Sequence, residues 1–131
     1  MPYAFALTVI LALVAALQIA LAAGAPWGRL AWGGSHVVLP TRLRIGSLVA
    51  VLIYTVIVVI AFTRLGALQV LPQGAAVVAM WIVFGYFALG IVLNAVSRSK
   101  PERLVMTPTT VVLTVLSLLI ALGAGSLVTA A

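Results

Sequence analysis

Long apolar runs, separated by short polar segments, make up most of this chain. Four of these runs contain no charged residue, and they cover residues 4–23, 45–63, 75–95 and 108–128. Each is close to the length of about 20 residues that a helix needs to cross the hydrocarbon core of a bilayer. The pattern predicts an all-α, polytopic membrane protein, with a four-helix transmembrane bundle that forms one domain over residues 1–131.

Local signals agree with helices in these four runs. Residues 56–60 are all valine or isoleucine, a composition that favours a strand in water. In lipid an isolated strand leaves its backbone polar groups unpaired, so a helix is expected there. Prolines precede the later runs: Pro40 and Pro72 mark the expected starts of the second and third helices, and Thr107-Pro108 marks the fourth.

The distribution of positive charge predicts an orientation. With four spans, loops 24–44 and 96–107 lie on one side of the membrane, and loop 64–74 lies with both termini on the other. The second side carries only Arg64, whereas the first carries six cationic residues: Arg29, Arg42, Arg44, Arg98, Lys100 and Arg103. Cytoplasmic loops are enriched in lysine and arginine. The sequence therefore predicts a multi-pass protein of the cell (inner or plasma) membrane with extracytoplasmic N and C termini.

Composition narrows the classes of function. Hydrophobic residues make up 66% of the chain and charged residues 6%, against about a quarter charged in soluble domains. This excludes a water-soluble globule and a disordered chain, and so apolar a chain does not fit a nucleic-acid binder despite its net charge of +6. With no cysteine, one histidine and one acidic residue, the sequence offers no cluster of metal ligands, and no cofactor is expected.

The first polar loop has two interpretations. Trp27 and Trp32 flank Arg29, and Gly33-Gly34 follows directly. In the first interpretation the loop lies at the membrane interface, where tryptophans anchor at headgroup depth and arginines meet anionic lipid. In the second it folds back over the bundle, and the two glycines form a tight turn that delivers His36 into a cavity.

The single acidic residue, Glu102, also has two interpretations. One is an ion pair with an arginine of its own loop, Arg98 or Arg103, or of the neighbouring loop, Arg42 or Arg44. The other is a general base or a contact for a substrate amine. Together with His36, Glu102 is a candidate catalytic residue for a small membrane enzyme.

Polar residues inside the predicted spans are candidates for function, because such residues are costly in lipid. These residues are Gln18, Ser47, Tyr86 and Asn94. In one interpretation they line a cavity that opens to the cytoplasm, and in the other they form hydrogen bonds between helices. Small residues four apart predict close-packing faces on the first and fourth helices: Ala12, Ala16, Ala20 and Gly24, and Thr114, Ser117, Ala121 and Gly125. Ile57 is expected to face lipid.

These observations favour a non-catalytic protein, either an accessory subunit or a binder of a lipid or another hydrophobic ligand. Its expected partners are anionic membrane lipids, with a larger membrane complex or a homo-oligomer as further partners. An anionic headgroup or phosphate is predicted to bind a ring of six residues: Trp32, Arg42, Arg44, Asn94, Arg98 and Arg103. Two alternatives remain open: an enzyme acting on a lipid or isoprenoid through His36 and Glu102, and an oligomeric channel or transporter.

Overall fold

The computed structural model describes residues 1–126, which form four long helices and no strand. The helices are α1 (Pro2–Ala22), α2 (Thr41–Arg64), α3 (Gln73–Ala95) and α4 (Lys100–Ala121). All four are long and apolar enough to cross a membrane. The predicted all-α fold with four potential spans is therefore confirmed, which suggests a multi-pass membrane protein.

The start of the fourth helix differs from the prediction. The sequence placed a loop over residues 96–107, but α4 begins at Lys100, eight residues before Pro108, and Pro108 lies inside it. Ser99-Lys100-Pro101 is an equally good start, with Pro101 in the first turn, where its missing N–H breaks no helical bond. A helix in lipid tolerates an internal proline. Pro108 cannot donate to the carbonyl of Leu104, and the hydroxyls of Thr109 and Thr110 donate to the next two carbonyls, those of Val105 and Met106.

The end of α4 also differs. This helix ends at Ala121 and is followed by turns. The predicted end near Val128 lies outside the described residues.

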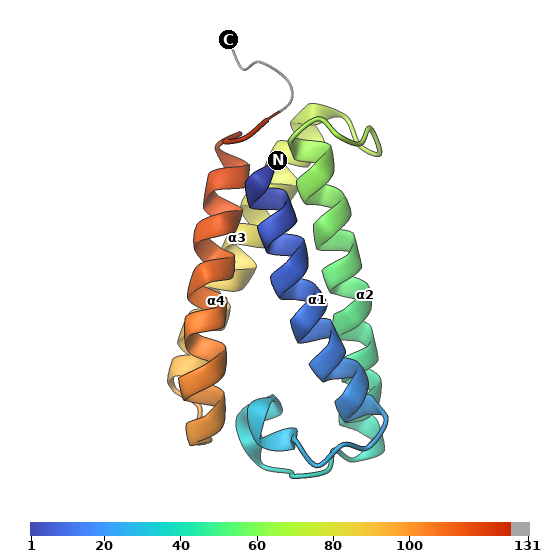
Figure 1. The fold of residues 1–131 in the computed structure, drawn as a ribbon, viewed down its shortest axis with the longest axis vertical. Coiled ribbons are helices and arrows are strands. Elements are labelled where there is room, and N and C mark those ends of the chain that lie inside the picture. The colour runs from blue at the N-terminus through green and yellow to red at the C-terminus, as the bar shows by residue number, and fades with distance from the viewer. Residues whose placement is uncertain (127–131) are drawn as a thin grey trace.

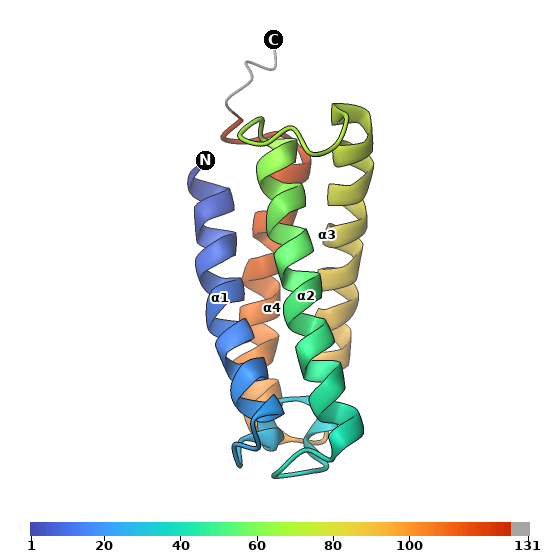
Figure 2. The ribbon, with the colours of Figure 1, turned by 90° about the vertical axis from the view of Figure 1, so that its right-hand side faces the viewer.

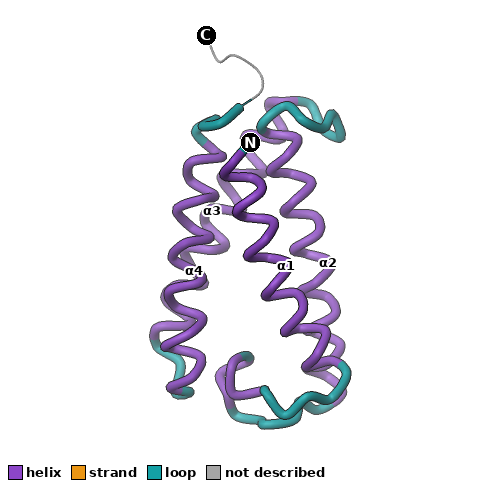
Figure 3. The backbone as a smooth tube through the Cα atoms, viewed as in Figure 1, coloured by secondary structure: helices purple, strands orange, loops and turns teal. Residues whose placement is uncertain are grey.

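The four helices form two antiparallel hairpins, α1–α2 and α3–α4 (Figure 1). One end of the bundle holds the N-terminus, the α2–α3 connection and the end of α4 (Figure 2). The other end holds the short α3–α4 connection and the α1–α2 connection, residues 23–40, which we call the strap. The strap contains two short 3₁₀ helices, η1 (Gly28–Leu30) and η2 (Trp32–Gly34), and passes beneath the bundle (Figure 3).

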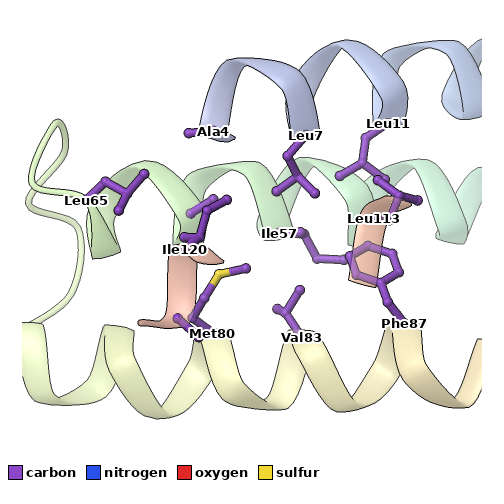
Figure 4. Close-up of a cluster of buried hydrophobic side chains, with 12 residues drawn as sticks. Ala4, Leu7, Leu11, Ile57, Leu65, Met80, Val83, Phe87, Leu113 and Ile120 are labelled. Atoms are coloured by element: carbon purple, nitrogen blue, oxygen red, sulfur yellow. The ribbon is translucent and has the colours of Figure 1, made fainter. Parts of the chain in front are cut away.

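The hydrophobic core occupies the half of the bundle nearest the termini. Figure 4 shows its side chains meeting from all four helices, with Leu7 and Leu11 opposite Ile57, Met80 and Phe87. The expectation that Ile57 faces lipid is wrong, since its side chain is buried in this core. Toward the strap, α1 and α4 diverge (Figure 1), and this divergence leaves room for the cavity described below.

The two predicted small-residue faces have different outcomes. On α4, the side chains of Thr114, Ser117 and Ala121 are buried, as predicted for a packing face. On α1, Ala12 and Ala16 are exposed, and the helix packs instead through a different face: Ala4, Leu7, Leu11, Val14, Gln18 and Leu21. The regularly spaced small residues therefore lie on an outer face of α1. The face that packs against the neighbouring helices is formed mainly by larger residues.

Candidate functional site

A cavity of about 490 Å³ lies in the half of the bundle nearest the strap. This volume falls within the range typical of small-molecule sites, about 300–1,000 Å³. All four helices and the strap contribute to its walls, which are mainly apolar. Its polar lining residues are Gln18, Trp32, Tyr54, Tyr86, Asn94, Ser97, Glu102 and Thr110.

The strap closes the lower end of this cavity because its backbone folds back on itself. The N–H of Gly28 donates to the carbonyl of Val37 at 2.8 Å, and Nη1 of Arg29 donates to the carbonyl of Gly34 at 2.9 Å. The Ser99 hydroxyl, which precedes α4, donates to the carbonyl of Arg29. The second interpretation of this loop is therefore the one that the structure supports, except that His36 stays exposed and does not line the cavity.

Trp32, rather than His36, is the polar side chain of the strap that lines the cavity, and Leu30 and Ala31 line it as well. Its indole Nε1 donates to the Ser47 hydroxyl at 3.1 Å, and its ring lies so close to Gly46 that a Cβ there would come within 2.9 Å. Trp32 has a φ of +55°, the only positive φ of a non-glycine residue among the described residues. Such backbone strain is found where surrounding contacts fix a residue at a ligand site or a switch.

Glu102 lies in the first turn of α4, where a carboxylate is favoured by the N-terminal end of the helix dipole. Its side chain is only 6% exposed and accepts hydrogen bonds from the Ser97 side chain and the Gly33 backbone. Its second oxygen, Oε2, is buried without a hydrogen-bond partner. Glu102 therefore lines the cavity but keeps one unused acceptor oxygen that is buried in the protein.

The expected ion pair of Glu102 with an arginine does not form in the described part of the chain, because the nearby arginines bind backbone carbonyls. Arg103 donates to the carbonyl of Ser97 at 2.8 Å, and Arg44 to that of Leu39 at 2.9 Å. At the opposite end of the bundle, Arg64 donates to the carbonyl of Ala121, the last residue of α4. These arginines satisfy carbonyls in connections and at a helix end.

Gln18 provides a second unused acceptor. Its side chain, 8% exposed, is hydrogen-bonded to the Tyr54 hydroxyl, while its Oε1 is buried without a partner. Asn94, by contrast, donates from Nδ2 to the Thr110 hydroxyl at 2.8 Å, which joins α3 to α4. Asn94 therefore forms the predicted hydrogen bond between helices, and its side chain also lines the cavity.

An apolar groove adjoins the cavity on the flank of the bundle, between α1 and α4. It has a volume of about 440 Å³, and the hydroxyl of Thr109 is the main polar group on its walls. Val14 and Met106 line both the groove and the cavity. These two side chains therefore lie at the boundary between the cavity and the groove.

The structure brings together only part of the predicted site. Trp32, Asn94 and Glu102 line the cavity, whereas His36, Arg42, Arg44, Arg98 and Arg103 do not. Sequence reasoning missed Tyr54; its hydroxyl near the middle of a predicted span was the available signal. It also missed that Glu102 is buried, because Pro108 was taken as the start of the helix.

Over residues 1–126, the fold and the site define an all-helical protein with four potential membrane spans and a polar-lined cavity at the strap end. Comparison with protein-family models, curated proteins and solved structures finds no match for this chain.

Proposed function

We propose that the chain is inserted in the cell membrane with the strap in the cytoplasm and both termini outside. The support is the segregation of charge. Six cationic residues lie on the strap, in the first turns of α2 and α4 or in the α3–α4 connection, and Arg64 lies near the other end. An excess of positive charge in short loops directs those loops to the cytoplasm.

This orientation is testable with a pair of single cysteines, because the natural chain contains none. Leu68→Cys lies in the α2–α3 connection and Val38→Cys in the strap, and both positions are exposed. A membrane-impermeant maleimide added to intact cells is expected to label the first variant and not the second. Both should react after the membrane is permeabilised, and the reverse pattern in intact cells would contradict the orientation.

We propose further that the protein binds a lipid-like amphiphile, with its polar head in the cavity and its hydrocarbon tail in the groove. The observation that carries this proposal is that a largely apolar cavity with a few polar lining groups adjoins an apolar groove on the bundle's flank, with Val14 and Met106 common to both. Ligand sites combine largely apolar walls with a few polar groups that fix orientation in this way.

The contacts favour this function over a membrane enzyme. The enzyme hypothesis needs His36 and Glu102 to converge, but His36 is exposed on the strap while Glu102 is buried at the cavity wall. Binding of anionic lipid by the exposed residues Arg42 and Arg98, a role as an accessory subunit, and assembly into a homo-oligomer, with or without a channel, stay predictions.

Filling the cavity tests the binding function. Ala50 lines the cavity, whereas its neighbour Val49 is exposed and does not. Ala50→Phe is therefore expected to lower the retention of a bound amphiphile about tenfold, since the new ring takes up ligand space, and Val49→Phe should leave it unchanged. The measurement is native mass spectrometry of protein released from phosphatidylcholine nanodiscs that contain dodecanol. Equal retention by both variants, or none by the parent, would contradict the proposal.

A further inference from the structure

The strap forms the wall of the cavity at the end where the bundle is widest. Its residues 30–33 line the cavity, and its two 3₁₀ helices lie between the diverging ends of α1 and α4 (Figure 1). A displacement of these four residues would therefore open the cavity at this end while the four helices keep their positions.

The two ends of the strap are anchored beside one arginine of α2. Nε of Arg44 donates to the carbonyl of Leu39 at 2.9 Å, and Nη2 lies 3.2 Å from the place that a Cβ on Gly24 would take. Gly24 follows α1 with a φ of +101°, and Pro40 directly precedes α2. Movements of loops are absorbed at a few such residues next to regular elements. The ends of the strap are therefore fixed points, and its middle lies between them.

The middle of the strap is held together by its own hydrogen bonds. Gly28 donates to the carbonyl of Val37, and Arg29 donates to that of Gly34. These bonds join the two halves of the strap to each other rather than to the helices. Residues 28–37 can therefore move together without losing them.

Side chains of the bundle hold this unit in place through polar contacts. The hydroxyl of Ser99, which precedes α4, donates to the carbonyl of Arg29. The hydroxyl of Ser47, on α2, accepts from Nε1 of Trp32 at 3.1 Å. Each such bond contributes little net stability, because water offers an equivalent bond when the contact breaks.

One aromatic ring fixes the strap to α2. The ring of Trp32 lies against Gly46, with Cζ2 and Cη2 2.9 Å from the place that a Cβ on this glycine would take. The backbone of Trp32 is left-handed, with a φ of +55°. A residue other than glycine keeps such a conformation only where its surroundings impose it. The contact of the ring with α2 and the strained backbone therefore depend on each other.

We propose that the strap is a lid on the cavity, which turns about its two ends and is latched shut by the Trp32 ring against Gly46 and Ser47. In the closed state, residues 30–33 wall the cavity as described above. In the open state the ring leaves α2, the backbone of Trp32 relaxes, and the head group of a ligand exchanges with water. The role as a lid rests on the proposed binding of an amphiphile, whereas the opening itself needs no ligand.

Distances between spin labels measure the opening. The chain contains no cysteine, so Ser35→Cys in the strap and Leu104→Cys on α4 carry the labels, and both positions are exposed. Double electron–electron resonance in phosphatidylcholine nanodiscs, without added ligand, should show one main distance and a minor, longer one. The reference pair, Leu48→Cys on α2 with Leu104→Cys, should keep one distance in every variant. A matching change in the reference pair would overturn the lid, since the helices would then move instead.

Two substitutions on α2 weaken the latch and leave the strap sequence intact. Gly46→Ala places a methyl group where the Trp32 ring lies, and it should raise the population of the longer distance about tenfold. Ser47→Ala removes the acceptor of the indole N–H and should raise this population about fivefold. The matched control is Gly85→Ala on α3, where a Cβ meets no atom within 4 Å. Equal populations in the parent and all three variants would overturn the proposal.

A release experiment separates the lid from the binding function. Protein loaded with dodecanol is mixed with an excess of dodecanol-free nanodiscs, and native mass spectrometry follows the loss of the bound molecule. Gly46→Ala should release dodecanol about tenfold faster than Gly85→Ala. Equal rates would overturn the role of the strap as a lid. Failure of the parent to retain dodecanol would overturn the binding function together with this role, whereas the distances alone decide whether the strap opens.

Discussion

Gly28→Ala is expected to destabilise the protein by about 2–3 kcal/mol, because the strap has no room for a methyl group at this position. A Cβ on Gly28 would lie 2.0 Å from the carbonyl oxygen of His36 and 2.8 Å from that of Val37. Both are backbone atoms, so the strap must open to accommodate the methyl group. Opening removes the hydrogen bond from Gly28 to Val37. Unfolding in mixed detergent micelles measures the loss.

Two other glycines are the controls for this substitution. A Cβ on Gly74 meets no atom within 4 Å, so Gly74→Ala should leave stability unchanged or slightly higher. Gly33 also has open space, but its φ is +76°, so Gly33→Ala isolates the cost of a left-handed backbone, about 1–2 kcal/mol. Stability of Gly28→Ala equal to that of Gly74→Ala would show that the strap is not packed as described.

Leu7→Ala is expected to destabilise the bundle by about 2–5 kcal/mol, the range measured when a buried leucine leaves a cavity. Leu7 is 0% exposed and packs in the cluster between the four helices. Leu52→Ala makes the same chemical change on α2 at a side chain that is 64% exposed. In a bilayer the lost contacts of Leu52 are replaced by lipid tails, so its variant should remain close to the parent in the same unfolding assay. Equal losses for the two variants would place the core elsewhere.

The positions of the helices could be predicted largely from the sequence because length and hydrophobicity alone determine which segments can cross a bilayer. α1 to α3 overlap the predicted runs, and their ends differ by at most four residues. The start of α4 could not be placed in this way. Pro101 and Pro108 are both compatible with a helix start, and only the packing of the first turn of α4 against the strap distinguishes them.

Residues of the candidate site could be predicted only where the local sequence makes them stand out, and not where their position depends on contacts with distant segments. Asn94 and Glu102 stood out as polar groups in or near apolar helices, and both line the cavity. Positive charge did not indicate which residues line the cavity, since Arg44 and Arg103 bind carbonyls that become available only when the connections fold. His36 was expected to point into the cavity, but it lies outside it. The reason is that the backbone has a positive φ at three consecutive residues, Trp32, Gly33 and Gly34. The residue type does not predict such a conformation for a tryptophan.

The position of the apolar groove on the flank of the bundle determines which concentration of a ligand, that in the membrane or that in water, controls its binding. The groove is lined by α1 and α4 and not by the strap, so in the proposed membrane orientation an amphiphile would reach it by lateral diffusion in the bilayer. Its occupancy then follows the mole fraction of the ligand among the surrounding lipids, not its concentration in water. Because partitioning has already concentrated the alkyl chain in the membrane, a modest preference for the protein over bulk lipid is enough to fill the site, and dilution of the aqueous phase leaves the occupancy almost unchanged.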